Sequence, residues 1–230
     1  AGEVGQAESE FNERGAGMLR IDGEIRTSFV VDPPDGRIPY KPQVVAALGL
    51  GGPPAERGDG PEERALSERC LSSQLTGAPM IPGPDTSVLQ FVQAPGVLAI
   101  VCEKYHEVRV IPLSGAPLPA RLTPSWIGTS AGRWAGDVLV VETAGFRPGI
   151  TDRGRRLVVS GATRVVERFR RTAADAILYD VDVADPDLLT RPWRAQLKLV
   201  PAGRIFEYAC HEGNYGLPDI LRIFRQADGR

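Results

Sequence analysis

The chain has 230 residues, of which 42% are hydrophobic and 24% are charged, the balance of a globular protein that buries a sizeable core. Lys and Arg total 27 against 29 Asp and Glu, so no excess of positive charge is present to attract nucleic acid or an anionic membrane. The longest apolar runs, such as Val97 to Cys102, are far shorter than the roughly 20 residues that span a bilayer. We therefore expect neither a nucleic-acid partner nor a membrane partner.

The first 87 residues are rich in proline and glycine, and we expect them to wrap the domain as irregular chain. The interrupting stretches are DPPDGRIPY at 32–40, GLGGPP at 49–54 and GAPMIPGPD at 77–85. Because proline and glycine break regular elements, only two short helices are predicted there, over Lys41–Leu48 and Pro61–Ser72. The stretch from Leu50 to Gly60 is expected to be exposed and mobile.

From Val88 onward, short β-branched runs alternate with turn residues, which is typical of an antiparallel β protein. The predicted strands, about eight in number, are Val88–Gln93, Val97–Glu103, Glu107–Leu113, Val138–Thr143, Ala162–Thr172, Ala176–Val183, Trp193–Val200 and Arg204–Cys210. A closing helix is expected over Pro218–Gln226, with proline in its first turn. Residues 88–230 would form the β domain and residues 1–87 its irregular covering, one structural domain overall.

Alternation assigns the carboxylates to faces, because neighbouring side chains of a strand point to opposite sides. Glu167 shares a face with Val165 and Phe169. Glu142 and Glu103 likewise share faces with apolar residues of their own strands. Several carboxylates are therefore expected to point into one interior.

The two histidines, His106 and His211, each lie among carboxylates and tyrosines, in CEKYHEVR at 102–109 and YACHEGNY at 208–215. The ordinary pKa of histidine, about 6.5, suits proton transfer near neutrality. Because adjacent His and Glu residues of a strand point apart, they need a turn before they can act together. Catalysis or binding by this pair and plain structural hydrogen bonding stay as alternatives.

The sequence motifs for metal-dependent, nucleophilic and nucleotide-dependent chemistry are weaker. His106, His211 and a glutamate would make a two-histidine, one-carboxylate metal set, but their spacing matches no helical metalloprotease or paired-cysteine zinc motif. No metal is predicted, and a metal-dependent enzyme is kept as a second alternative. The stretch GTSAG at 128–132 lacks the strand-to-helix setting of a nucleophile elbow and is interpreted as a loop. No glycine-rich nucleotide motif follows a strand, so no cofactor is expected.

Tryptophan and arginine residues are further candidates for ligand binding. Each of them also has an ordinary structural interpretation. The tryptophans are interpreted first as core plugs or caps at a barrel end: Trp126, Trp134 and Trp193. Three arginines could anchor an anionic ligand, although paired charge on a barrel rim is the commoner arrangement: Arg109, Arg168 and Arg191.

Three cysteines, Cys70, Cys102 and Cys210, permit one disulfide and one free thiol, and these residues alone do not choose the pair. A cytosolic protein with all three thiols reduced is the plain alternative. The chain opens with AGEVGQAESE and no charged-then-apolar leader, which fits either a removed leader or a trimmed chain.

A set of motifs resembles a large family of mostly uncharacterised bacterial proteins, many of them exported. The motifs are FVVDPPDGRIPY, SERCL, VLAIVCEKYHEVRVIPLSG, GTSAGRWAGDVLVVETAGF, RVVERFRRTAADAILYDVDVADPDLLTRPW and EYACHEGNY. The resemblance covers nearly everything after Ser28 and carries no secure activity. It implies a Cys70–Cys210 disulfide with Cys102 as the spare thiol, and a periplasmic or extracellular location, although a cytoplasmic location fits the missing leader equally well.

The resemblance also favours a lipocalin-like (calycin-type) antiparallel barrel around an interior that holds a small molecule. The alternative is a half-open β sandwich whose mouth the N-terminal region covers. In either arrangement His211 would follow the last strand and His106 would end an earlier one, so that both could meet at one rim.

The leading hypothesis is a cofactor-independent lyase or isomerase that acts on a small, largely apolar, oxygenated molecule by cyclisation, double-bond migration, dehydration or retro-aldol cleavage. A histidine would take a proton, a tyrosine would donate to an oxygen, and a glutamate would orient the imidazole or act as the acid. The expected catalytic residues are His106, His211, Tyr105, Glu103, Glu142 and Glu167. The expected substrate-binding residues are Tyr208, Tyr215, Arg109, Trp134 and Trp193.

The rival hypothesis is a binding or carrier protein with the same pocket and no turnover. A third makes 208–215 a structural corner that pins the closing helix. Histidines within reach of each other across a cavity with a carboxylate would favour catalysis, and separated or solvent-facing histidines would favour binding or structure. A homodimer is left open.

Overall fold

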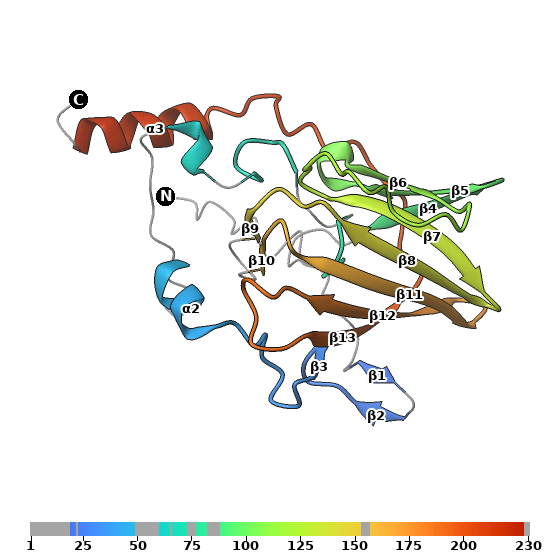
Figure 1. Ribbon diagram of the computed structural model, residues 1–230. Coiled ribbons are helices and arrows are strands. Elements are labelled where there is room, and N and C mark those ends of the chain that lie inside the picture. Colours follow the sequence, from blue (N-terminus) through green and yellow to red (C-terminus); the bar gives the residue numbers. More distant parts are fainter. Residues whose placement is uncertain are drawn as a thin grey trace.

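The computed structural model describes residues 19–21, 23–48, 60–64, 66–72, 77–81, 88–152 and 157–227, without the side chains of 48, 150–152 and 227. The fold is mainly β, with antiparallel sheets and a short C-terminal helix (Figure 1). This part of the fold prediction is confirmed. The exposed and mobile stretch predicted at 50–60 lies outside the described residues except for Gly60, which is buried.

Two antiparallel sheets contain most of the described strands. The larger has six strands, in the order β3 (Val30–Asp32), β13 (Trp193–Leu199), β12 (Ala176–Ala184), β11 (Arg164–Ala173), β8 (Val138–Ala144) and β7 (Thr129–Ala135). The smaller has three, in the order β4 (Leu89–Ala94), β5 (Val97–Cys102) and β6 (Val108–Pro112). Two short pairs join β1 (Arg20–Ile21) to β2 (Glu24–Ile25) and β9 (Gly149–Asp152) to β10 (Leu157–Val159).

The helical elements are few and short. They are α2 (Pro42–Leu48), the 3-10 turns η1 (Pro61–Glu63) and η2 (Lys104–His106), and α3 (Gly216–Ala227). Figure 1 shows α3 and α2 on the same side of the molecule, away from the β7–β8 hairpin. No helix in the described part of the chain is long and apolar enough to cross a membrane.

The inner faces of the two large sheets meet in one apolar core. Phe91 of β4 packs edge to face on Phe169 of β11, with ring centroids 5.9 Å apart, and Tyr179 of β12 lies 5.0 Å from Phe169. Trp193 is 2% exposed in the same core. The three-stranded sheet therefore covers part of the inner face of the six-stranded sheet.

Hydrogen bonds between the described strands close no barrel. Strands β3 and β7 are the edges of the larger sheet, and β4 and β6 are the edges of the smaller. A single bond from Gly115 N to Gly132 O, 3.3 Å long, links the chain after β6 to β7.

Seven of the predicted strands are present, with ends shifted by two residues at most, and two predicted elements are wrong. Over Pro61–Ser72 only η1 is helical, because the chain becomes extended at Arg64 and takes a positive φ of 53° at Cys70. Over Arg204–Cys210 there is no strand, because the backbone there meets side-chain acceptors and not a neighbouring strand.

Strand β7 begins at Thr129 and contains the last four residues of the GTSAG stretch that was predicted to be a loop. Its glycine has a packing reason: a Cβ at Gly132 would lie 2.8 Å from Leu113 Cδ2 and 3.0 Å from Ile111 Cγ2. Glycine inside a strand marks such a close approach. The glycine content that suggested a loop therefore reflects contact with the end of β6.

We expect Gly128→Ala to lower the free energy of unfolding by about 3 kcal/mol, because a positive φ and a steric clash act together there. Its φ is +71°, and a Cβ would lie 2.8 Å from Thr143 Cγ2 and 3.0 Å from the Ala144 carbonyl oxygen. Gly136 is the matched control, with a φ of +63° and no atom within 4 Å of its Cβ position. Gly136→Ala should lower the free energy of unfolding, measured by urea denaturation, by only about 1 kcal/mol. Equal losses in the two variants would contradict the clash.

Candidate functional site

Both histidines are exposed, and neither lies in the core. His106 is part of η2, the corner between β5 and β6, and His211 lies in the turn before α3. The interior of the two sheets, where acid–base chemistry was expected, therefore contains no histidine. By the criterion set out from the sequence, solvent-facing histidines favour binding or structure over catalysis.

The η2 corner has an unusual backbone. Tyr105 and His106 are consecutive non-glycine residues with positive φ, 62° and 51°. The corner is closed by hydrogen bonds from Cys102 N to Glu107 O, 2.8 Å, and from Glu103 N to Val88 O, 3.2 Å. Each left-handed residue costs about 1–2 kcal/mol, so the surrounding contacts must hold this conformation. Such strain is found most often at sites with a function.

The segment 204–210 lies against this corner. The Glu103 carboxylate accepts the Phe206 N–H at 2.8 Å, and His106 Nε2 accepts the Tyr208 N–H at 3.4 Å. The sequence thus placed Glu103, His106 and Tyr208 in one site, and the structure brings them together. Their contacts, however, are between side chain and backbone.

Two tyrosines form the wall of this site. The rings of Tyr105 and Tyr208 meet edge to face with centroids 5.0 Å apart. The ammonium of Lys104, a buried residue, lies 5.6 Å from the Tyr105 centroid and 5.9 Å from the Tyr208 centroid. A cation over an aromatic ring is attracted by the ring's negative face, so Lys104 helps to hold the pair.

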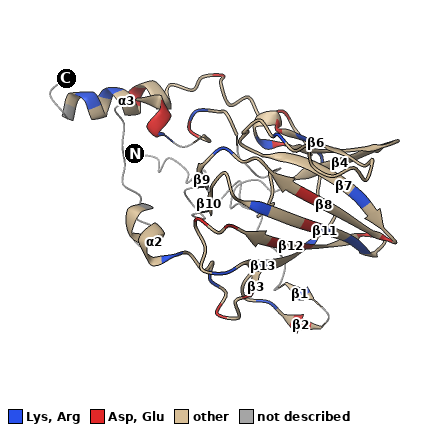
Figure 2. Ribbon diagram, viewed as in Figure 1, with Lys and Arg blue, Asp and Glu red and all other residues tan. Residues whose placement is uncertain are grey.

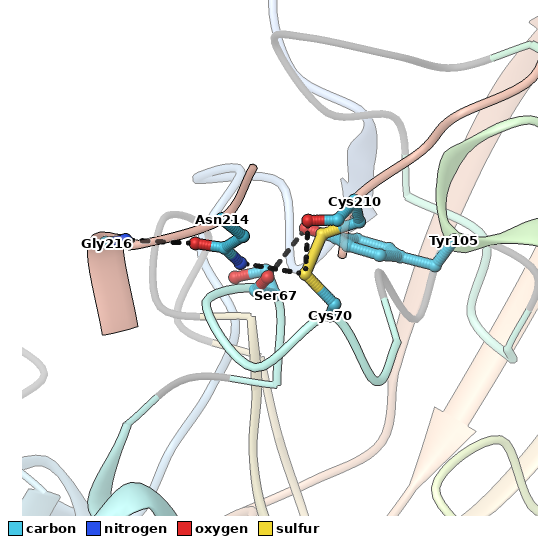
Figure 3. Close-up of a disulfide and its surroundings, with 6 residues drawn as sticks. All are labelled: Ser67, Cys70, Tyr105, Cys210, Asn214 and Gly216. Carbon is cyan, nitrogen blue, oxygen red and sulfur yellow. Dashed lines mark hydrogen bonds between the residues drawn. A yellow bond between two sulfur atoms is a disulfide. The ribbon is translucent and has the colours of Figure 1, made fainter. Parts of the chain in front are cut away.

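A pocket of about 500 Å³ opens beside the tyrosine pair. Its lining includes Ser67, Tyr105, Tyr208, Asn214, Leu217 and Ile220. The Tyr105 hydroxyl donates to Ser67 O at 2.9 Å (Figure 3). The Tyr208 hydroxyl makes no hydrogen bond within the part of the chain that the structure describes.

The disulfide between Cys70 and Cys210 lies at the edge of this pocket, with Cα atoms 5.7 Å apart, and Cys102 is buried and not part of a disulfide. The pairing that the resemblance implied is confirmed. Asn214 Nδ2 donates to Cys70 Sγ at 3.1 Å, and Asn214 Oδ1 accepts the Gly216 N–H that begins α3 (Figure 3). Asn214 therefore joins the disulfide to the start of the helix.

The interior holds a different polar cluster, built on Arg109 and Glu167. The Arg109 guanidinium donates to both Glu167 carboxylate oxygens, to Thr143 Oγ1 at 2.7 Å and to Ser130 Oγ at 2.9 Å. Tyr179 donates its hydroxyl to Glu167 at 2.8 Å. Arg109 and Glu167 are 1% and 0% exposed. The carboxylate predicted to point inward is confirmed at Glu167, but protein groups satisfy it.

Burial and charge act in opposite directions on this cluster. Burial by itself lowers the pKa of Arg109, but the facing Glu167 carboxylate outweighs it and raises that pKa above its ordinary value. Burial and the same carboxylate raise the pKa of the Tyr179 hydroxyl well above 10.0. Arg109 stays charged and Tyr179 stays protonated, which is the state of a structural ion pair.

The remaining predicted residues lie apart from the pocket. Figure 2 shows charged residues at intervals along the six-stranded sheet, where Glu142 of β8 is exposed. The prediction that Glu142 points inward is wrong, because the inner face of β8 carries Leu139, Val141 and Thr143. Trp134 is 51% exposed and Tyr215 is 75% exposed, and neither lines the pocket.

The sequence analysis missed several pocket residues, Ser67, Asn214, Leu217 and Ile220, and also Lys104, whose ammonium lies beside the two tyrosine rings. The sequence did contain an indication for two of these residues, Ser67 and Asn214. Pairing Cys70 with Cys210 brings the SERC motif against YACHEGNYG, and these two motifs contain Ser67 and Asn214.

Metal-binding geometry is not found in the described residues, where no three His, Cys, Asp or Glu side chains are grouped as a metal ion requires. His106 and His211 are thus not brought together with a third ligand. Comparisons of the chain with protein-family models, with curated proteins and with solved structures find no match. The proposal of a function therefore rests on the site itself.

Proposed function

We propose that the chain is a small-molecule-binding protein whose ligand lies in the pocket beside the Cys70–Cys210 disulfide. The observation that carries this proposal is the tyrosine pair held on the strained η2 corner. Tyr105 is fixed by its hydrogen bond to Ser67 O, whereas the Tyr208 ring lines the pocket with a hydroxyl that no described residue engages. A positioned aromatic ring with an unused hydroxyl is suited to orient a ligand.

The lining indicates the chemistry of the ligand. A volume of about 500 Å³ is within the range of small-molecule sites. Leu217, Ile220 and the tyrosine rings offer apolar surface, and the Tyr208 hydroxyl and the Asn214 amide offer polar contacts. The ligand we propose is a largely apolar molecule that carries an oxygen able to hydrogen-bond to Tyr208.

Acid–base catalysis of the lyase or isomerase type in the same pocket is the second candidate. One observation favours it: the consecutive positive φ values of Tyr105 and His106, a strain that is common at catalytic sites. Because His106 Nε2 accepts the Tyr208 N–H, Nδ1 bears the N–H of the neutral imidazole and is the nitrogen that can donate a hydrogen bond to an oxygen of a ligand. Unchanged turnover of an identified substrate by His106→Ala would show the catalytic candidate to be wrong.

We also propose a cellular location, a class of partner and a type of fold. The disulfide supports an oxidising location, periplasmic or extracellular. The near-neutral charge balance supports a partner that is neither nucleic acid nor a membrane surface. The two sheets, whose described strands do not join into a closed barrel, suit the half-open β sandwich that was the alternative to the lipocalin-like barrel.

The binding proposal is tested by nuclear magnetic resonance titration with p-cresol and cinnamyl alcohol, two small oxygenated aromatic probes. We expect saturable shifts confined to residues 67–70, 104–106 and 208–220. Tyr208→Phe should weaken binding about fivefold to tenfold, the value of one hydrogen bond. Tyr215→Phe is the matched control, because Tyr215 is 75% exposed and does not line the pocket, and it should bind as the unmodified protein does. The absence of saturable shifts in the pocket would refute the proposal.

A further inference from the structure

Three segments line the pocket, and two of them, residues 66–72 and the chain that leads into α3, share no secondary structure. Tyr105 of η2 is the third and contacts both, through its hydrogen bond to Ser67 O and its ring contact with Tyr208. Ser67 and Glu68 come from the turns at 66–72, and Tyr208, Asn214 and Leu217 come from the chain that leads into α3. No strand pairing joins these segments in the described structure. The geometry of the pocket therefore depends on the individual contacts between them.

The strongest of these contacts is covalent. The Cys70–Cys210 bond joins the two segments across a sequence separation of 140 residues. Two further contacts between them are weak or local: Asn214 Nδ2 donates to Cys70 Sγ, which is itself part of the disulfide, and the Arg64 guanidinium lies 5.6 Å from the centre of the Phe224 ring. Figure 3 shows the disulfide at the centre of this arrangement.

The stretch before α3, residues 200–209, has few anchors within the described structure. Residues 200–209 have no regular structure, and most of them are exposed. They contact the η2 corner through exposed hydrogen bonds to Glu103 and His106, 2.8 and 3.4 Å long, and through the Tyr208 ring, which meets Tyr105 and the Lys104 ammonium. Exposed hydrogen bonds of this kind are worth about 1 kcal/mol each, too little to fix a segment alone.

We propose that oxidation of Cys70 and Cys210 assembles the pocket, so that the protein binds its ligand only after it has entered an oxidising environment. This inference rests on the proposed binding function and adds its regulation. The β core does not need the disulfide, because its strands are joined by continuous ladders that contain neither Cys70 nor Cys210. The reduced chain would keep its sheets and lose the pocket.

The chemistry is thiol–disulfide exchange with a small-molecule disulfide as the oxidant. One cysteine thiolate attacks that disulfide, forms a mixed disulfide and releases one small thiol. The second cysteine thiolate attacks the protein sulfur of the mixed disulfide and releases the second small thiol. The protein loses two protons and two electrons, and the oxidant becomes two thiols. A dithiol reverses the reaction, and we expect attack at Cys210, the less buried sulfur-bearing residue.

The first measurement is hydrogen–deuterium exchange by mass spectrometry on the full chain, oxidised and after reduction with dithiothreitol. Reduction should raise amide exchange at least fivefold in residues 204–216 and 66–72, with β11 and β12 unchanged. Reoxidation with glutathione disulfide should restore protection. Unchanged exchange in both segments after complete reduction, verified by alkylation of Cys70 and Cys210, would overturn the proposal.

The second measurement is p-cresol binding by the same three samples and by the Cys70→Ser/Cys210→Ser variant. We expect reduction and the double substitution each to weaken binding at least tenfold, and reoxidation to restore it. If the oxidised protein binds no probe, the binding function itself is wrong. If the oxidised and reduced proteins bind equally, binding stands and the redox control is wrong. Because reduction and reoxidation use the unmodified chain, misfolding of the variant would not affect this test.

Discussion

Glu167→Gln should lower the free energy of unfolding by about 3–5 kcal/mol, because it leaves the Arg109 charge buried without its partner. Glu167 is fully buried on β11 and meets Arg109 of β6 across the core. Neutralising the carboxylate removes a charge-assisted contact at each of its oxygens and also weakens the Tyr179 contact. Urea unfolding followed by circular dichroism measures the loss.

Two further variants test whether the loss of stability in Glu167→Gln comes from the unpaired buried charge. Asp182→Asn breaks the Arg168–Asp182 pair, whose side chains are 42% and 40% exposed, and it should cost at most about 1 kcal/mol. The double variant Arg109→Met/Glu167→Leu removes both charges together and should recover most of the stability lost in Glu167→Gln. A loss below about 1 kcal/mol in Glu167→Gln, or a double variant less stable than it, would contradict the buried-charge explanation.

Asp185→Ala should cost about 3 kcal/mol at pH 7, because one buried carboxylate connects the turn before β11 with the chain after β12. Its oxygens accept the Ser160 N–H at 3.2 Å, the Ser160 hydroxyl at 2.8 Å and the Thr163 hydroxyl. They also accept the Asp187 N–H at 2.9 Å and the Leu188 N–H at 3.0 Å. Asp187→Ala, which removes an exposed carboxylate from the same turn, should change stability by no more than about 0.5 kcal/mol.

The Asp185 effect should depend on pH in a defined direction. Burial by itself raises the pKa of Asp185, but the hydrogen bonds from Thr163, Ser160 and the backbone outweigh it and lower that pKa below 3.8. A lowered pKa in the folded state stabilises the protein above the pKa of the unfolded state, and this stabilisation is lost as the pH falls through the folded-state value. The stability difference between the unmodified protein and Asp185→Asn should therefore be constant from pH 7 to 5 and shrink below pH 4. A difference that grows on acidification would contradict this assignment.

The sequence predicted those features that local chemistry controls. Period-two alternation in TRVVERF placed Glu167 on the buried face with Val165 and Phe169, and β11 confirms it. Turn residues and β-branched runs located most strands of the two large sheets, since strand ends depend on nearby proline and glycine. The dense titratable groups around His106 and Tyr208 also indicated one site, and those residues do meet.

Tertiary structure decided the features that need a partner far away in the sequence. Arg109 was interpreted as a ligand anchor or as paired charge on a barrel rim, yet it is buried in the core and its neighbours Val108 and Val110 are exposed. The reason is Glu167, which lies 58 residues further along the chain and supplies the carboxylate that makes a buried guanidinium tolerable. Glu142, flanked by apolar residues in the same way, has no such partner in the described interior and points outward.

The same division applies to the pocket. The sequence by itself determined its chemical groups, because the two histidines, the tyrosines and the cysteines lie in recognisable local motifs. Only the fold decided that the tyrosines and not the histidines line the pocket, because two positive φ values turn the η2 corner and a disulfide brings residues 66–72 to the chain before α3. Neither a strained corner nor a covalent link across 140 residues follows from local propensity, since both are stabilised by contacts that exist only in the folded chain.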